Sequence, residues 1–173
     1  MDAMKIPALE TDRLRMRQWR DGDLGVYASM CEDPEIMKYL GDGRVLNRME
    51  AWRSMAMLLG HWQLRGFGMW VVTLREDDRM IGRAGFFQPE GWPGFEIGWT
   101  FARSAWGHGY ATEAAQRALA YAVDVLGKDE VISVIHPDNA RSIRVAERLG
   151  ERLLRHDAIG EKKVLIYGMS LSR

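Results

Sequence analysis

The chain has 173 residues, which suits one domain with a sizeable core and is short for two. Lysine and arginine together number 24, as do aspartate and glutamate, so the formal net charge of zero favours neither nucleic acid nor an anionic membrane as a partner. Cys31 is the only cysteine, which excludes an intramolecular disulfide framework and a cysteine-based zinc cluster and makes a reducing, cytoplasmic location the default expectation.

The first third of the chain is predicted to fold as a strand and a short helix. Residues Leu14 to Trp19 alternate between apolar and charged side chains, as a strand with one wet face does. A short helix then begins at Asp21 or Asp23 and runs through Cys31. It ends before the stretch DPEIMKYLGDG, which we interpret as a loop.

A long helix and three strands follow. Asn47, with Glu50 three residues later, forms a capping-box-like start for a helix that extends through Trp62. The strands are joined by the short links REDD and QPEGWPG, so neighbouring strands are expected to be antiparallel. The three strands are predicted over Met69 to Leu74, Met80 to Phe87 and Phe95 to Phe101.

The last third alternates helices and strands, which gives an α+β pattern in one domain over residues 1–173. No run of about 18 apolar residues that could span a bilayer occurs, so no membrane partner is expected. The predicted elements are a helix from about Tyr110 to Leu126, a strand over Val131 to Ile135, a helix from about Ala140 to Leu149 ended by Gly150, and strands near Arg152 to His156 and Lys163 to Leu171.

The stretch SAWGHGYATEA places Gly107 and Gly109 directly before the alanine-rich helix. The first turn of a helix has N–H groups without partners, and glycines remove the Cβ atoms that would keep an anion away. A phosphate fits this need, and a plain strand-to-helix turn is the alternative. A P-loop requires a lysine that is absent here, and a dinucleotide fingerprint requires a small residue where Thr112 stands.

Several motifs together resemble the GNAT acetyltransferase superfamily, and within it the RimJ/RimL-like N-acetyltransferases, over nearly the whole chain. They are, in order, ETDRLRMRQW, DPEIMKYL, MIGRAGF, FEIGW, WGHGYATEA and PDNARSIRVAERLG. The resemblance implies a mixed, mostly antiparallel sheet of about seven strands with helices on both faces. It also implies that the central strands splay apart and that acetyl-CoA binds between them.

The resemblance further assigns cofactor contacts by position. The amides of Trp106, Gly107, His108, Gly109, Tyr110 and Ala111, with Thr112 beside them, would hold the pyrophosphate. The main chain of Trp99, Thr100 and Phe101 would pair with the pantetheine arm, and Asn139 and Ser142 would contact its far end. Ser104 replaces the family's usual Gln or Arg, which removes one side-chain contact and leaves the backbone contacts intact.

Acetyl transfer from a thioester to an amine needs no enzyme nucleophile, so Cys31 is not required for it. A base must accept the amine proton, and Glu96, just before Gly98 on a central strand, is our candidate; a structural carboxylate is the alternative. A glycine inside a strand is typical of a bulge or a close backbone approach, although Gly98 could simply make room for a bulky neighbour.

The group that protonates the departing thiolate is less clear from the sequence. Ala146 stands where many relatives have a tyrosine acid, so that acid is missing. Ser142 is the remaining candidate for the acid that protonates the thiolate. Alternatively, it is only a structural residue of the first turn of a helix. His108 is interpreted as a weak electrostatic aid toward a CoA phosphate. With one cysteine and no His-x3-His spacing, no metal site is expected.

The residues that bind the acceptor amine are predicted to lie on or near the loops that flank the strand ends. Tyr39, Phe86, Phe87 and Trp92 are expected near the substrate, with Glu90 and Asp42 as acidic residues that could attract an amine. The leading function is acetyl transfer from acetyl-CoA to a protein N-terminal α-amine or a small amine. The alternatives are a non-catalytic acyl-CoA-binding module and an acetyltransferase for an antibiotic or polyamine. The apolar C-terminal strand KVLIYGMSL either pairs across a homodimer or ends the sheet.

Overall fold

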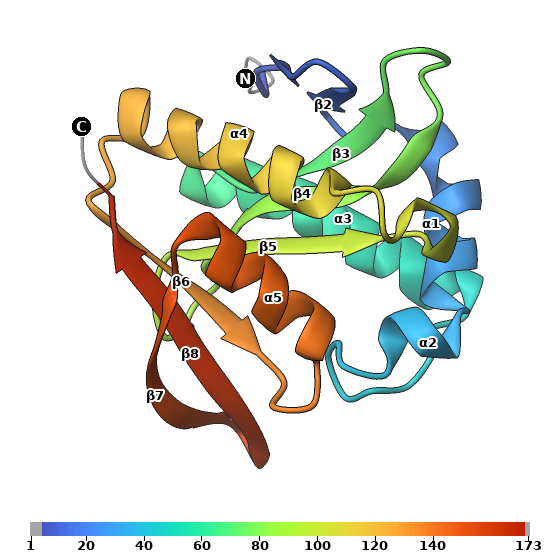
Figure 1. The fold of residues 1–173 in the computed structure, drawn as a ribbon. Coiled ribbons are helices and arrows are strands. Elements are labelled where there is room, and N and C mark those ends of the chain that lie inside the picture. Colours follow the sequence, from blue (N-terminus) through green and yellow to red (C-terminus); the bar gives the residue numbers. More distant parts are fainter. Residues whose placement is uncertain (1–4, 172–173) are drawn as a thin grey trace.

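The computed structural model describes residues 5–171, which form a sheet of eight strands with helices on both of its faces (Figure 1). The strands are β1 (Leu9–Glu10), β2 (Leu14–Arg17), β3 (Met69–Leu74), β4 (Met80–Phe87), β5 (Glu96–Phe101), β6 (Glu130–Ile135), β7 (Arg152–Ile159) and β8 (Lys162–Ser170). The helices are α1 (Leu24–Cys31), α2 (Pro34–Met37), α3 (Arg48–Arg65), α4 (Tyr110–Asp124) and α5 (Ala140–Leu149), with short 3-10 turns at Asp21–Asp23 and Arg103–Ala105.

The strand order is β1-β2-β3-β4-β5-β6-β8-β7, and every neighbouring pair is antiparallel except β5 with β6. The predicted mixed, mostly antiparallel sheet is therefore confirmed. The structure has one strand more than the roughly seven predicted, because β1 has only two residues and is too short for a periodic pattern.

Two cores cover the two faces of the sheet. Trp70 and Val72 of β3 point to the core shared with α4, while Met69 and Val71 point to the core shared with α1 and α3. Because both faces are buried, β3 is apolar along most of its length and lacks the alternation of a half-exposed strand. In Figure 1, α4 and α3 accordingly lie on opposite sides of β3 and β4.

Local sequence signals set the helix ends. Asn47 and Glu50 form the predicted capping box with two hydrogen bonds of 2.9 Å, and Gly150 ends α5 with φ of 96°. The helix α4 ends at Asp124, two residues before the predicted end. Four of its alanines, Ala114, Ala115, Ala118 and Ala122, are fully buried, so the helix axis lies close to the sheet.

The stretch predicted as a loop after α1 contains the one-turn helix α2. Asp33 caps this helix by accepting a hydrogen bond of 2.9 Å from the Glu35 amide, and Pro34 occupies the first turn, where its missing N–H has no consequence. The loop prediction was wrong for these four residues. Their effect is to bring Lys38 and Tyr39 to the cavity described below.

The C-terminal strand β8 pairs with β6 on one side and β7 on the other, so it is an interior strand. The prediction that KVLIYGMSL pairs across a dimer or ends the sheet was therefore wrong, because the edge strands are β1 and β7. Homodimer formation itself stays a prediction. Within residues 5–171, no helix combines the length and the apolar character that crossing a bilayer requires.

The strands β5 and β6 pair only at Glu96 and Ile132 and then diverge. Each is followed at its carboxyl end by a helix, α4 after β5 and α5 after β6. The gap between the strands therefore opens toward two helix N-termini, as is typical of ligand sites next to parallel strands.

Candidate functional site

Two adjoining cavities occupy this gap. The first, of about 790 Å³, is lined by the glycine turn, the start of α4 and the start of α5, and we call it the glycine-turn cavity. The second, of about 1010 Å³, lies between α1, α3 and the β7-β8 hairpin, and we call it the inner cavity. Both are lined by Tyr39, Trp99, Thr100, Asn139 and Ser142, so they form one continuous cleft.

The glycine-turn cavity has the features of an anion site. Gly107 and Gly109 both have φ of 80°, which favours glycine, and a Cβ at Gly107 would meet nothing within 4 Å. The first-turn amides of α4 open into this space, where the positive end of the helix dipole attracts anions. Four cations line the same cavity: Lys38, Arg141, Arg144 and Arg148.

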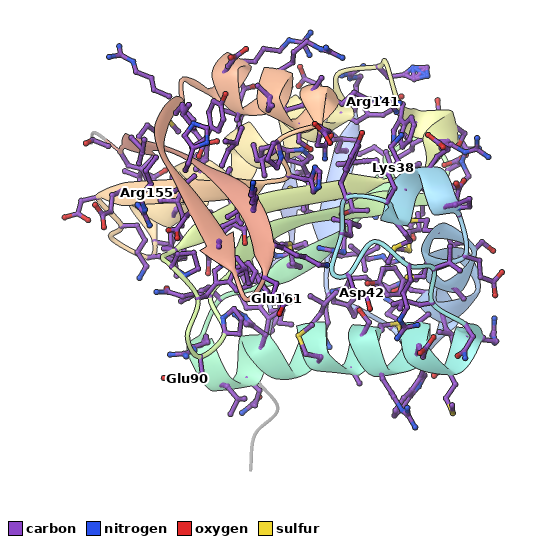
Figure 2. All side chains as sticks on the ribbon, turned by 90° about the horizontal axis from the view of Figure 1, so that it is seen from below. Lys38, Asp42, Glu90, Arg141, Arg155 and Glu161 are labelled. Atoms are coloured by element: carbon purple, nitrogen blue, oxygen red, sulfur yellow. The ribbon has the colours of Figure 1, made fainter. Side chains whose placement is uncertain are left out.

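Figure 2 shows Lys38 and Arg141 on facing elements at the same end of the molecule. The Arg141 guanidinium lies 3.6 Å from the centroid of the Trp106 ring, which fixes it over the glycine turn. Every predicted cofactor-contacting residue lines one of the two cavities except His108. The His108 side chain is exposed and its ring is tilted against that of Tyr110, and its electrostatic contact with a CoA phosphate stays a prediction.

The strand β5 presents main-chain groups to the gap. The carbonyls of Ile97 and Phe101 accept hydrogen bonds of 2.9 Å from Ser133 Oγ and Trp106 Nε1, which lie away from β4. Because hydrogen-bonding direction alternates along a strand, the N–H and C=O of Trp99 face the same side. Trp99 lies beyond the single pairing of β5 with β6, so its main chain lines the cleft.

The start of α5 holds Asn139 and Ser142 beside Trp99. Asn139 is the N-cap residue, and its Oδ1 accepts a hydrogen bond of 3.2 Å from the Ser142 amide. Trp99 Nε1 donates to Ser142 Oγ at 3.3 Å, so the hydroxyl lies at the junction of the two cavities. Ala146, one turn later, is fully buried against Ile135.

Glu96 lines the inner cavity and carries a perturbed carboxyl. Burial raises the pKa of Glu96 to about 8, against the opposing effects of two hydrogen bonds and of the Arg83 charge. Trp92 Nε1 donates to its Oε2 at 2.7 Å, and the Val134 amide donates to its Oε1 at 3.2 Å. A carboxyl with this pKa accepts a proton readily near neutral pH once it is ionised.

A second buried carboxyl, Glu151, lies behind the gap, where 3% of the residue is exposed. Ser133 Oγ is 3.1 Å from Glu151 Oε1 and 2.9 Å from the Ile97 carbonyl oxygen, and one hydroxyl proton cannot serve both acceptors. When Glu151 is protonated, it can donate to Ser133, which then donates to Ile97. Burial raises the pKa of Glu151 to about 7, against the opposing effect of the hydrogen bond that Ser133 donates to the ionised form.

The predicted acceptor-side residues divide into two groups. Tyr39, Phe87, Trp92 and Asp42 line the inner cavity. Phe86 is fully buried on the opposite face of β4 in the core shared with α4, so its prediction was wrong. Glu90 was also wrongly placed, because it is exposed and pairs with Arg65 at 3.2 Å. Figure 2 shows Glu90 beside one end of α3.

Sequence reasoning missed Arg83, Lys38 and Arg141, which line the cleft, and Glu151 behind it. A charged residue inside the apolar strand MIGRAGFF was the available signal for Arg83. Burial raises the pKa of the Cys31 thiol, which also lines the inner cavity. Among residues 5–171 no cluster of three metal-ligating side chains occurs.

Comparison with known proteins gives one family and a shared fold. Residues 13–152 match the model of the acetyltransferase (GNAT) domain. The chain is 30% identical over 155 residues to the N-acetyltransferase p20 of Bacillus licheniformis, covering 87% of this chain and 86% of p20. An acetyltransferase from Agrobacterium tumefaciens superposes with a TM-score of 0.86 at 28% identity, covering 98% of this chain and 97% of the other.

A more distant structure shares the fold alone. Spermidine N-acetyltransferase from Vibrio cholerae, in complex with CoA and spermine, superposes with a TM-score of 0.72 at 16% identity. The match covers 93% of this chain and 97% of the other.

Proposed function

Because the chain belongs to the GNAT acetyltransferase domain family, we propose that it transfers the acetyl group of acetyl-CoA directly to a primary amine. The acceptor is either a protein N-terminal α-amine, as expected of a RimJ/RimL-like enzyme, or a small-molecule amine. The observation that carries this proposal is the Glu96 carboxyl on the wall of a cleft that is continuous with a phosphate-type cavity. The two cavities suit two substrates present at once.

We assign the glycine-turn cavity to acetyl-CoA. The amides of the glycine turn would bind the pyrophosphate, and Lys38 and Arg141 add positive charge. The pantetheine arm would pair with the main chain of Trp99. We therefore expect the main-chain contact with pantetheine at Trp99 and not over the whole of Trp99 to Phe101. The main chain of Thr100 faces Arg83 of β4, and the Phe101 carbonyl already accepts a hydrogen bond from the Trp106 indole N–H.

Asn139 and Ser142 are at the junction of the cavities, which supports our proposal that they contact the thioester end of acetyl-CoA. Acetyl-CoA supplies a carbonyl that is activated by a thiolate leaving group. The amine attacks this carbonyl, the new C–N bond forms as the C–S bond breaks, and Glu96 takes the amine proton directly or through water. The thiolate takes a proton from Ser142 or from solvent. The raised thiol pKa of Cys31 agrees with a route that has no acyl-enzyme.

The test is thiol release from acetyl-CoA in the presence of N-terminal peptides, amino acids, polyamines or aminoglycosides. We expect release that requires an amine and yields the acetylated amine by mass spectrometry. Binding of acetyl-CoA without release on any amine would overturn the proposal in favour of a non-catalytic module. Ser142→Ala separates the two sources of the thiolate proton, because full turnover in this variant assigns that step to solvent.

A further inference from the structure

Arg83 is a cation of the inner cavity that has no hydrogen-bond or ion-pair partner among residues 5–171, although its charge lowers the pKa of Glu96. It lies on β4 and lines the inner cavity, partly buried. Over that part of the chain, its guanidinium makes no hydrogen bond and has no carboxylate within 4 Å, and its Nε atom is buried without a partner. The buried Arg17, by contrast, forms two hydrogen bonds of 2.9 and 2.8 Å with Asp23.

A partly buried guanidinium without a counterion is destabilising for a fold, because desolvation is not offset by pairing. An anionic ligand from outside the chain would supply the missing partner of Arg83. Its planar fork of N–H donors matches the geometry of a carboxylate.

The strand register places Arg83 and Glu96 on one face of the sheet. Arg83 pairs with Thr100, and Phe87 pairs with Glu96, four residues away along β5. Between these two pairs, Gly85 faces Gly98, and the Met69 side chain lies over them, because a Cβ at Gly98 would meet Met69 Cε at 3.0 Å. An acceptor can lie against this thioether with its amine toward Glu96 and its other end toward Arg83.

The other charges of the inner cavity disfavour a polycation. Lys38, Lys162 and Lys163 line it together with Arg83. The lining holds three acids. Asp42 pairs with Arg44 at 3.1 Å, Asp138 is exposed at the junction with the glycine-turn cavity, and Glu96 is mostly protonated below pH 8. Figure 2 shows Asp42 and the hairpin tip at Glu161 on the same side of the molecule.

We propose that the acceptor is a small aminocarboxylate, whose carboxylate Arg83 binds while its amine faces Glu96. The Tyr27 and Ser54 hydroxyls, hydrogen-bonded to each other at 3.0 Å in the same lining, offer further donors to that carboxylate. This inference rests on the proposed acetyl transfer and narrows its acceptor to one chemical class, away from polyamines and aminoglycosides.

The experiment compares matched acceptors in thiol release from acetyl-CoA. The probes are α-amino acids, β-alanine and γ-aminobutyrate, each beside its own carboxamide. We expect kcat/KM to be about 10- to 100-fold higher for the best acid than for its amide, the range for loss of a charge-assisted hydrogen bond. Arg83→Gln should abolish this preference by raising KM for the acid, with KM for acetyl-CoA unchanged. Because the Arg83 charge lowers the pKa of Glu96, the acid and its amide are compared within the same variant, where a change in the base affects both alike.

Lys162→Gln, which removes an exposed charge at the cavity mouth, is the matched control and should keep the preference. A separate readout is binding of the corresponding carboxylic acid without an amine, by calorimetry to wild type and Arg83→Gln. Equal use of acids and amides by the wild type, better use of polyamines or peptides, or equal carboxylate binding by both proteins overturns the inference. Failure of every amine to be acetylated overturns the proposed function instead, and leaves the calorimetry to decide carboxylate binding.

Discussion

The protonation of Glu151 makes stability depend on pH in a way that one substitution removes. The pKa of Glu151 is raised from 4.5 to about 7 in the folded protein, so the folded state holds this proton more tightly than the unfolded state. The associated stabilisation is fully present below pH 4.5 and is lost as the pH rises through about 7. A shift of 2.5 units corresponds to about 3 kcal/mol, of which about 2 kcal/mol is lost between pH 5.5 and 8.5.

The assay is urea unfolding of the wild type and Glu151→Gln at pH 5.5 and 8.5. Glutamine resembles the protonated carboxyl and does not titrate, so the stability of the variant relative to wild type should rise by about 2 kcal/mol from pH 5.5 to 8.5. Glu96 is present in both proteins, so its own titration cancels except for the effect of the Glu151 charge, which is the smallest of the causes that shift the pKa of Glu96. Glu147→Gln, on the exposed surface of α5, is the control and should show no such difference. An unchanged stability difference at the two pH values would refute the protonated Glu151–Ser133–Ile97 chain.

Four further substitutions test separate parts of the structure, and one of them, Gly60→Ala, is the control for Gly82→Ala. Trp92→Phe removes the indole N–H that donates to Glu96 at 2.7 Å, so the pKa of Glu96 should rise and the acidic limb of kcat should move to higher pH; an unmoved limb contradicts this contact. Gly82→Ala places a Cβ 2.5 Å from the Thr100 carbonyl oxygen and should destabilise the protein by about 1–3 kcal/mol in urea unfolding. Gly60→Ala, in α3 with nothing within 4 Å of the new Cβ, should instead be neutral or stabilising, and equal losses would contradict the packing argument. Arg17→Met leaves Asp23 buried without its ion pair and should cost about 3–5 kcal/mol, whereas a loss below 1 kcal/mol would mean that the pair adds little.

Features that depend on a few neighbouring residues could be predicted from the sequence. Local patterns predict three features that the structure confirms: the capping box of Asn47 and Glu50, the end of α5 at Gly150 and the buried alanine face of α4. The mixed sheet and the family were accessible because several such motifs occur in a fixed order.

Features that depend on distant segments could not be predicted in the same way. Phe86 and Phe87 are adjacent and equally apolar, and only the packing of α4 decides which of them faces the core and which the inner cavity. The raised pKa values of Glu96 and Glu151 likewise depend on burial by segments that lie far apart in the sequence. The helix α2 was missed because tertiary packing and one cap residue stabilise a single turn that has no periodic pattern.

The most direct test of Glu96 as the base is the pH profile of kcat for the wild type and Glu96→Gln, with two acceptors whose amines differ in pKa. For the wild type we predict a limb near pH 8 that stays in place when the acceptor is changed, because it belongs to the carboxyl of the enzyme. Glu96→Gln should lower kcat by about 10²- to 10⁴-fold and should lack this limb. A variant that keeps the wild-type rate and the same limb would contradict the assignment of Glu96 as the group that accepts the amine proton.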